Sequence, residues 1–184
     1  MEELAQHILD LLMNSWEAGA TVIELNIIED SQKDIIIITA ADNGRGMDEK
    51  LMIQALDPFK TGRKTRKVGL GLALLQAAAE ACNGKVELTP AHSQGLIVKA
   101  TFQRSHWDRP PLGDVAGTIT AFLCSASSIR VIYTHEFNGC LFTFDSKQIE
   151  KIVSPVPVNH PKVLQWIRET IGQGLSKLYD GGDE

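Results

Sequence analysis

Apolar residues along this chain recur at two spacings, one typical of helices and one typical of strands. In residues 3–19 they return every three or four positions, which predicts a helix. Alternation follows in residues 21–29, with Ile23, Leu25 and Ile27 on one side of a predicted strand. Residues 33–41 form a second predicted strand, dominated by β-branched side chains that favour burial. The buried stripe of the first helix is expected to contain Leu4, Ile8, Leu11, Leu12 and Ser15.

Two further helices and two further strands are predicted before residue 104. Residues 48–56 form a short helix with Asp48 as its cap, and residues 68–82 form a longer helix that Asn83-Gly84 ends. Residues 57–67 are polar and basic and are expected to form a loop. Strands at 85–89 and 96–103 flank a turn at 93–95. The pattern indicates an α+β fold, an antiparallel or mixed sheet with helices on one face.

Tandem prolines at Pro110-Pro111 mark a change of character. We therefore expect a first domain at residues 1–104 and a C-terminal α+β extension at residues 105–184, which could serve as a docking module. Within the extension, the pattern predicts a helix at 114–125 and a hairpin of 130–136 with 139–144 around Asn138-Gly139. A final helix is expected from Pro161 through about residue 178.

Composition narrows the class of protein. The chain has 184 residues, 43% hydrophobic and 22% charged, which is typical of a globular protein. No apolar run approaches the roughly 20 residues of a membrane helix, and the acidic N-terminus does not resemble a secretory signal. The three cysteines have no metal-ligand or disulfide spacing. We expect a cytoplasmic protein without a membrane partner.

Charge is acidic overall and basic in one place. The net charge of −5 makes nucleic acid an unlikely partner. Five cations nevertheless fall within residues 60–67, directly before a glycine pair. A solvated loop would explain them, but we favour phosphate binding because of that glycine pair. The five cations are Lys60, Arg63, Lys64, Arg66 and Lys67.

The segment 42–47, Asp-Asn-Gly-Arg-Gly-Met, is the first candidate for ligand binding. Asp42 ends a buried strand, and its carboxylate could accept a hydrogen bond from the exocyclic amine of adenine. Gly44 and Gly46 would let the chain approach the base, and Met47 offers an apolar wall. The alternative is structural, because Asp-Asn-Gly is also a common turn sequence.

Two other segments carry candidate chemistry. Gly69 and Gly71 lie at the start of a predicted helix, where exposed backbone N–H groups favour phosphate, although neither the Walker pattern nor the dinucleotide fingerprint is present. Asn14 could supply one oxygen to Mg²⁺, and Asp10, one turn earlier, could act as a general base. Alternatively, Asp10, Asn14 and Glu17 form only the solvated side of an amphipathic helix.

These segments, in this order, resemble the GHKL superfamily: the ATP-binding domains of gyrase-type topoisomerases, the large heat-shock chaperone, sensor histidine kinases and mismatch-repair ATPases. Residues 10–21 resemble the asparagine box, residues 42–47 the first glycine box, residues 58–61 the kinase phenylalanine box and residues 68–72 the second glycine box. The resemblance covers residues 3–103 and implies a two-layer Bergerat-type fold.

The resemblance also implies roles for individual residues. Asn14 would bind Mg²⁺, Asp42 would hold adenine, and residues 57–68 would form a mobile lid. Asp10 would be the catalytic residue, although hydrolysing members usually carry Glu there. The residues implied to bind ATP are Asn14, Asp42, Gly44, Gly46, Met47, Phe59, Thr61, Lys64, Lys67, Gly69, Leu70, Gly71 and Leu72.

The function expected from these features is that of a histidine-kinase-like ATP–Mg²⁺ protein acting on a separate protein partner as kinase or ATPase. Too few residues precede the asparagine box for a phosphoacceptor histidine segment. The alternatives are a non-catalytic ATP-dependent binding switch and an ATP-driven dimer clamp. No histidine receives a role: His7 could flank the nucleotide but is expected on the helix surface, and His106, His135 and His160 lack carboxylate partners at a readable spacing.

Overall fold

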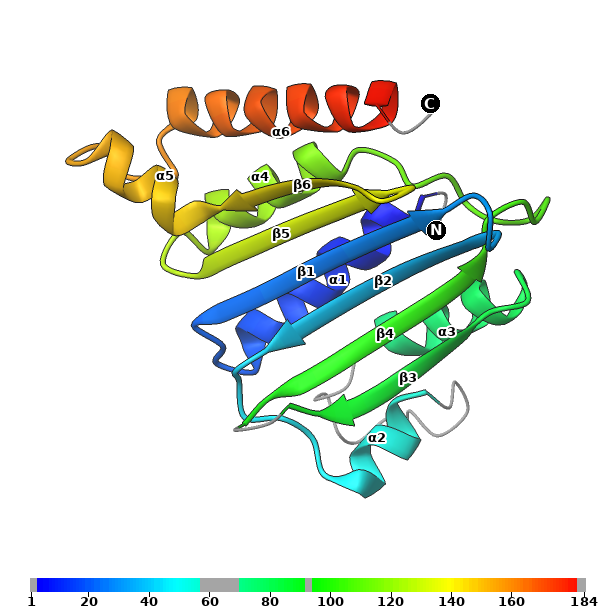
Figure 1. Ribbon diagram of the computed structural model, residues 1–184. Coiled ribbons are helices and arrows are strands. Elements are labelled where there is room, and N and C mark those ends of the chain that lie inside the picture. The colour runs from blue at the N-terminus through cyan, green and yellow to red at the C-terminus, as the bar shows by residue number, and fades with distance from the viewer. Residues whose placement is uncertain (1–2, 57–69, 92–93, 182–184) are drawn as a thin grey trace.

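The computed structural model describes residues 3–56, 70–91 and 94–181, and shows one layer of strands with helices packed behind it (Figure 1). The elements before residue 104 are α1 (Leu4–Glu17), β1 (Val22–Asp30), β2 (Ile35–Asp42), α2 (Glu49–Ala55), α3 (Gly71–Glu80), β3 (Lys85–Pro90) and β4 (Leu96–Gln103). After it come α4 (Val115–Ser125), β5 (Arg130–Phe137), β6 (Cys140–Asp145), α5 (Ser146–Val153) and α6 (Pro161–Gly181).

The strands form a single mixed sheet in the order β3-β4-β2-β1-β5-β6. The neighbours pair antiparallel except for β1 and β5, which run parallel. The helix α4 lies between β4 and β5 in the chain and crosses behind the sheet, so that β5 enters beside β1 (Figure 1). The predicted α+β, two-layer architecture is therefore confirmed, and the sheet is of the mixed type.

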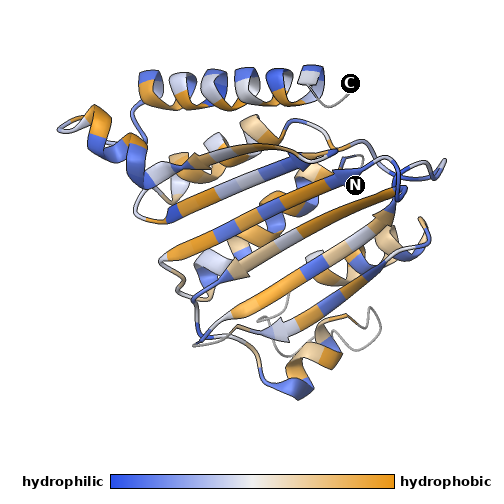
Figure 2. Cartoon of the chain, viewed as in Figure 1, coloured by the Kyte–Doolittle hydropathy of each residue, from blue (hydrophilic) through white to orange (hydrophobic). Residues whose placement is uncertain are grey.

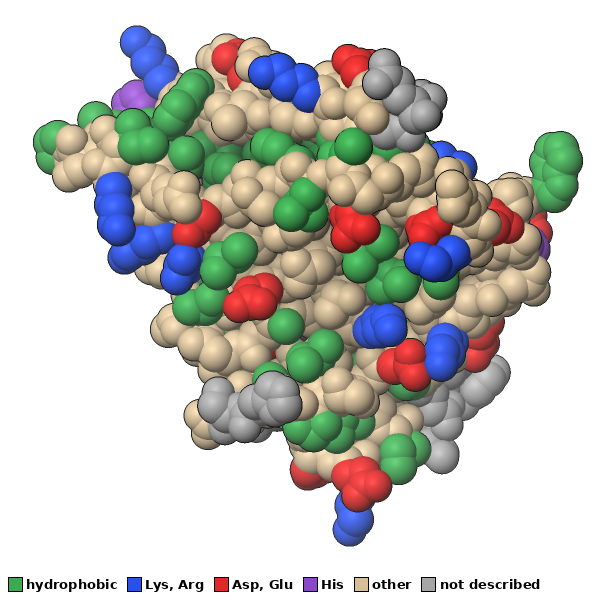
Figure 3. All heavy atoms as spheres, in the orientation of Figure 1, with side chains coloured by type: hydrophobic (Ala, Val, Ile, Leu, Met, Phe, Trp, Pro, Cys, Tyr) green, Lys and Arg blue, Asp and Glu red, His purple; other side chains and the backbone are tan. Residues whose placement is uncertain are grey.

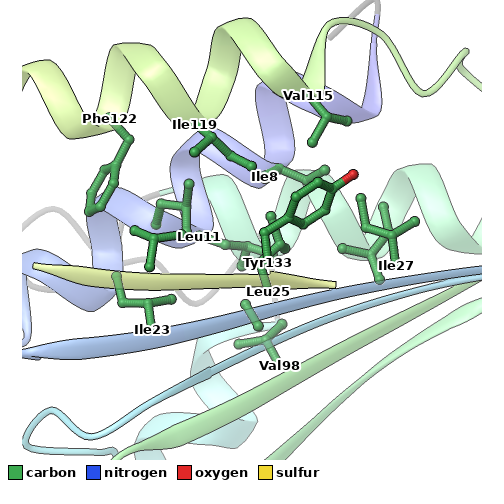
Figure 4. Close-up of a cluster of buried hydrophobic side chains, with 14 of the residues drawn as sticks. Ile8, Leu11, Ile23, Leu25, Ile27, Val98, Val115, Ile119, Phe122 and Tyr133 are labelled. Carbon is green, nitrogen blue, oxygen red and sulfur yellow. The ribbon is translucent and has the colours of Figure 1, made fainter. Parts of the chain in front are cut away.

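The core lies between the sheet and the helices α1, α3 and α4. Alternation along the strands decides which side chains enter it, and Figure 2 shows hydrophobic and hydrophilic residues taking turns along several strands. Ile23, Leu25 and Ile27 of β1 are fully buried, as the sequence predicted. Figure 4 shows how the core side chains of α1 and α4 point toward those of β1 and β5. They are Ile8, Leu11, Val115, Ile119 and Phe122 on the helices, and Ile23, Leu25, Ile27 and Tyr133 on the strands.

The other face of the sheet carries no helix in Figure 1, and it has a mixed character. Figure 3 views this face and shows acidic and basic side chains interspersed with hydrophobic ones. Lys99 and Glu24 are exposed there, whereas Ile28 and Ile37, paired across β1 and β2, are half-buried. Mixed polarity is expected for the solvated side of a mostly antiparallel sheet.

The C-terminal segment continues the sheet of the N-terminal segment. β5 pairs with β1 from Val22 to Glu29, and α6 packs on α4 and β6. The predicted division after residue 104 stays a prediction about folding units, since strands from both sides of it share one sheet. Within the described residues, no helix is long and apolar enough to cross a membrane.

One helix was not predicted. α5 begins directly after β6, with the side chain of Asp145 accepting a hydrogen bond from the Lys147 N–H as its cap. Eight residues offer only two turns of periodicity, which is a weak signal for a helix. The other predicted elements appear with shifts of a few residues at their ends, including the Asp48 cap of α2, which accepts from Leu51 N–H at 2.8 Å.

Candidate functional site

A pocket opens where α1, the end of β2, the start of β4 and the first turn of α3 meet. Five of the residues predicted to bind ATP line it: Asn14, Asp42, Gly46, Met47 and Leu72. Six lining residues had no predicted ligand role: Leu11, Ser15, Ala18, Ala40, Leu96 and Val98. The walls are thus mostly apolar, with a carboxylate, an amide and a hydroxyl among them. Such a pocket suits a flat apolar ring that carries a few polar groups.

Asp42 is the carboxylate of this pocket, and only 9% of its surface is exposed. Ser15 Oγ donates to Asp42 Oδ2 at 2.9 Å, and the Gly44 N–H donates to Asp42 Oδ1 at 2.8 Å. Each carboxylate oxygen keeps capacity to accept a second hydrogen bond. Asp42 is therefore oriented by the protein before a ligand arrives.

The turn after Asp42 is fastened to the beginning of β1. Asn43 Oδ1 accepts from the backbone N–H groups of Thr21 and Val22 at 2.9 and 3.0 Å, and Asn43 Nδ2 donates to Thr21 Oγ1. The Arg45 N–H donates to the Ala18 carbonyl at 3.0 Å. The role of Asn43 is thus structural in these contacts, and it holds the turn against the beginning of β1.

The backbone of the turn at residues 42–46 lies in close contact with the backbone at the start of β4. Gly46 has φ of +70°, and a Cβ built on it would lie 2.9 Å from the Gly95 carbonyl oxygen. Gly95 has φ of +110°, and a Cβ built there would lie 1.9 Å from the Asp42 carbonyl oxygen. Side chains at these positions would separate the two segments. The sequence marked Gly95 only as a turn residue, and its partner in the turn at 42–46 was not foreseen.

Asp10 lies one turn before Asn14 on α1 and reaches the second glycine-bearing segment. A Cβ built on Gly71 would lie 3.0 Å from Asp10 Oδ2. The carboxylate therefore sits against the first residue of α3, where the first N–H groups of a helix have no partner within the helix. Asn14 lines the pocket, whereas Asp10 and Gly71 lie close to each other and are not lining residues. The roles of all three in ATP binding or catalysis stay predictions.

The remaining predicted residues fall in three groups. Gly44 is not a lining residue but lies beside two of them, because a Cβ there would lie 3.0 Å from Ala18 Cβ and from Asp42 Oδ1. Leu70 precedes α3 and is 59% exposed. Phe59, Thr61, Lys64, Lys67 and Gly69, together with the rest of the predicted lid, lie outside the described residues.

The missed lining residues follow from the geometry of their elements. Ala40 precedes Asp42 by two positions on β2, so both side chains point to the same face. Val98 is paired with Ala40 across β2 and β4, which brings it to the same place. Ser15 was predicted only as part of the buried stripe. The register between β2 and β4 was the missing information, because a single sequence does not state which strands are neighbours.

The polar residues of the pocket could bind a magnesium ion only together with ligands from outside the protein. Among the described residues, no group of three or more His, Cys, Asp or Glu side chains is arranged to hold a metal ion. An amide oxygen such as that of Asn14 suits Mg²⁺ when phosphates and waters complete its octahedral shell. The residues present therefore fit a metal that arrives with a phosphorylated ligand.

The prediction for His7 was wrong. Its side chain is 2% exposed rather than on the helix surface, and burial lowers the pKa of its imidazole. His7 lies on the half of α1 that packs against other elements, so the polar residue type was a misleading signal. Two positions from His7 the helix is already anchored, with the Ala5 N–H donating to the Leu112 carbonyl at 2.8 Å.

A second buried polar cluster lies at the opposite end of the sheet from Asp42. His135 Nε2 is 3.0 Å from Glu29 Oε1, and Tyr133 Oη is 2.6 Å from His135 Nδ1. Tyr179 of α6 also donates to Glu29. His135 thus has a carboxylate partner that the sequence did not reveal, because Glu29 lies on another strand.

The electrostatics of this cluster centre on Glu29. Burial would raise the pKa of Glu29, but hydrogen bonds from His135 and Tyr179 and the nearby charge of Arg104 outweigh burial and lower it. An ionised carboxylate only accepts hydrogen bonds, so Nε2 of His135 carries the proton it donates. The hydrogen bonds of His135 and Tyr179 to Glu29 join β5 and α6 to β1, which indicates a structural role.

Comparison with known proteins identifies a family of ATPases. The model of a family described as histidine kinase-, DNA gyrase B-, and HSP90-like ATPase matches residues 1–106. The tetrathionate sensor histidine kinase TtrS of Salmonella typhimurium is 33% identical over 119 residues, 62% of this chain and 19% of that protein. The sensor protein KdpD of Clostridium acetobutylicum is 31% identical over 103 residues, 52% of this chain and 11% of that protein. This chain spans about a fifth or less of the length of these relatives.

A solved structure has a similar fold. The N-terminal domain of a DNA repair protein superposes with a TM-score of 0.51 at 14% identity, covering 84% of this chain and 58% of that chain. At such low identity the likeness concerns the fold alone. Its coverage extends well beyond residue 106, which is consistent with strands of the C-terminal segment sharing the sheet.

Proposed function

This chain belongs to the histidine kinase-, DNA gyrase B-, and HSP90-like ATPases, and we propose that it binds ATP with Mg²⁺ in the pocket around Asp42. The observation that carries the proposal is the orientation of Asp42 by Ser15 and Gly44 inside apolar walls. The adenine amine donates to the Asp42 carboxylate, and the ring packs against Met47 and Leu72. The sugar and phosphates extend toward α1 and the start of α3.

Asn14 is the metal-facing residue in this proposal. Asn14 lines the pocket, and its amide oxygen would be a ligand of Mg²⁺. The ion supplies charge neutralisation for the phosphate oxygens. Asn14 has no ionisable group, so it binds the metal without adding negative charge beside the triphosphate. The first turn of α3 supplies N–H groups that have no partner within the helix.

Asp10 is the proposed catalytic residue for transfer of the terminal phosphoryl group to a separate protein. The acceptor group on that protein attacks phosphorus, the bond from phosphorus to the ADP oxygen breaks, and Asp10 takes a proton from the acceptor when it carries one. The half-buried carboxylate against Gly71 supports this placement. The partner protein is proposed from the kinase-like relatives, and residues 105–184 are proposed to help dock it.

Calorimetry with the 184-residue chain tests the binding step. ATP with Mg²⁺ should release heat and saturate one site, whereas GTP should bind more weakly because its base presents a carbonyl where adenine has an amine. Equal binding of ATP and GTP would refute the role of Asp42, and absence of binding to either would refute the function. Transfer is then tested with ATP labelled in the terminal phosphate and candidate partner proteins.

The short side chain of Asp10 favours a second function, that of an ATP-dependent binding switch. Asp is one methylene shorter than Glu, and a Cβ built on Gly71 would lie 3.0 Å from the Asp10 carboxylate. A chain that binds ATP with little turnover would act as a switch for partner affinity. Turnover of Asp10→Glu distinguishes the two functions, because a sharp gain over the natural chain would support the switch, and a loss would support catalysis by Asp10.

A further inference from the structure

His7 is a buried imidazole that lacks polar partners within the described part of the chain. Its exposed fraction is 2%, and neither Nδ1 nor Nε2 has a hydrogen-bond partner there. A neutral imidazole has one donor and one acceptor, and burying both unpaired is unfavourable. Buried polar groups in native proteins are nearly always paired, so an exception calls for a partner that arrives or reorients during function.

The position of His7 connects it to the pocket. On α1, residues 7, 10, 11 and 14 are separated by three or four positions and share one stripe of the helix. Leu11 and Asn14 of this stripe line the pocket, and Asp10 touches the start of α3. His7 continues the stripe by one turn beyond Asp10, away from Asp42. In the proposed function the phosphates extend toward Asp10 and the start of α3, and His7 is the next polar residue along this stripe.

His7 and Asp10 are chemically matched. Side chains three positions apart on a helix have Cβ atoms roughly 5–6 Å apart, a separation that His and Asp bridge directly. Burial lowers the pKa of His7, and the charge of Asp10 opposes that shift. A neutral imidazole at pH 7 retains one N–H to donate, and the Asp10 carboxylate is an acceptor.

We propose that His7 is a positioning residue for Asp10, whose carboxylate accepts the His7 N–H when the nucleotide is bound. The hydrogen bond fixes the direction of the carboxylate against Gly71 and toward the terminal phosphate. Orientation of a base by a neighbouring group is a common arrangement in catalytic sites. The inference rests on the proposed function, since it concerns the same site and the same proton transfer.

The competing explanation is that His7 only fills space in the core. A space-filling imidazole would form no hydrogen bond when the nucleotide binds, although its pKa would still respond to the charge at position 10, and an apolar residue of similar volume would replace it without loss. The two explanations therefore differ in measurable ways. The tests need a chemical probe of the His7 ring as well as an assay of the reaction.

The first test follows the ring nitrogens of the histidines in the ¹⁵N-labelled chain by NMR, without nucleotide. Asp10→Asn should lower the pKa of His7, because a charge that favours the imidazolium is removed. Glu17→Gln is the charge-matched control: Glu17 is exposed and is the last residue of the same helix, and its substitution should leave the pKa of His7 unchanged. An identical pKa for His7 in the natural chain and in Asp10→Asn would overturn the proposal.

The second test adds a non-hydrolysable ATP analogue with Mg²⁺ to the same samples. The His7 N–H resonance should move to a hydrogen-bonded position in the natural chain and not in Asp10→Asn, while the exposed His160 stays in place. Calorimetry on each sample separates the two hypotheses. Binding without a response of His7 would reject the positioning role, whereas absence of binding would reject the proposed function and leave the nucleotide-free titration to decide whether His7 and Asp10 are coupled.

Variants complete the test where turnover is measurable. His7→Gln keeps an N–H donor and should retain most of the rate, whereas His7→Leu should lose about tenfold or more. In an Asp10→Asn background, His7→Leu should cost nothing further, because its effect passes through Asp10. ATP affinity should be similar in all of these chains. Equal rates for His7→Gln and His7→Leu would show that the N–H has no part in positioning.

Discussion

Asp42, the proposed adenine-binding residue, is held in place by a serine that the sequence marked only as buried and by a glycine of its own turn. Its two oxygens are engaged by Ser15 from α1 and by the Gly44 N–H from its own turn. The carboxylate ends β2, a strand whose alternate residues are buried, so the backbone that carries it is rigid. Binding of a purine here would therefore lose little conformational entropy in the Asp42 side chain.

Asp42→Asn should weaken ATP binding by roughly 1–3 kcal/mol, because a charge-assisted hydrogen bond to the adenine amine is replaced by a weaker one. Isothermal titration of the variant against the natural chain measures the change. Asp30→Asn is the control: it removes a carboxylate that pairs with Lys33 at 2.6 Å, far from the pocket, and should leave ATP affinity unchanged. Unaltered affinity in Asp42→Asn would mean that the carboxylate does not face the base.

Asn14→Ala should lower ATP affinity and make the remaining affinity less dependent on Mg²⁺, since one oxygen ligand of the metal is lost. Titrations with and without Mg²⁺ give the dependence as a ratio of dissociation constants. Asn26→Ala on β1, a half-buried residue of the sheet face without helices, provides the comparison. A ratio that stays the same in Asn14→Ala and in the natural chain would remove Asn14 from the metal site.

At the scale of elements, the pocket depends on two segments that touch through their backbones. The turn 42–46 and the start of β4 approach so closely that Gly46 and Gly95 each face the other segment. Helix and strand positions were predictable because each element carries its own periodicity, as in β1 with Ile23, Leu25 and Ile27. The approach of Gly95 to Asp42 was not, because it depends on the register of β2 with β4.

Gly95→Ala should destabilise the fold by about 2 kcal/mol or more, since a Cβ would lie 1.9 Å from a backbone oxygen and φ is +110°. Gly139→Ala is the matched control, with φ of +88° but nothing within 4 Å of its Cβ. It should show only the cost of positive φ, about 1 kcal/mol. Urea unfolding of both variants isolates the clash, and equal losses would contradict it.

The contact of α6 with the sheet should depend on acid pH through Glu29. Its pKa is lowered in the folded state, so its stabilisation is present above its unfolded pKa of about 4.3 and is lost as the pH falls through the lower folded value. Unfolding free energies measured from pH 3 to 7 should therefore fall at the acid end in the natural chain and vary less in Glu29→Gln. Parallel curves for the two chains would exclude Glu29 as the source.

At the scale of the whole molecule, one sheet contains strands from both sides of the predicted boundary after residue 104. The prolines at 110 and 111 indicated a boundary, yet the Leu4 N–H donates to the Pro111 carbonyl at 2.9 Å and ties this connector to α1. Local signals such as prolines report chain direction and stiffness. They carry no information on which strand will lie beside β1, so the pairing of β1 with β5 was beyond a reading of the sequence.

A chain of residues 1–104 should be markedly less stable than residues 1–184, because it loses β5 from the edge of β1 and α4 from the side of α1. Thermal unfolding should show one transition in the full chain and a lower midpoint or aggregation in the shorter chain. A chain of residues 1–104 with the same midpoint as the full chain would establish the predicted division at 104 as a true folding boundary.

The parallel pairing of Val22 with Arg130 also has a consequence for synthesis. β1 leaves the ribosome roughly a hundred residues before its second neighbour, an interval of about 5–20 s at ordinary translation speeds. During that interval one edge of β1 has no neighbouring strand to pair with. The strand itself is rich in isoleucine. When this protein is produced in a heterologous host, chaperones that bind the emerging N-terminal half should therefore raise the yield of folded protein. They should help more than slower translation of the C-terminal half.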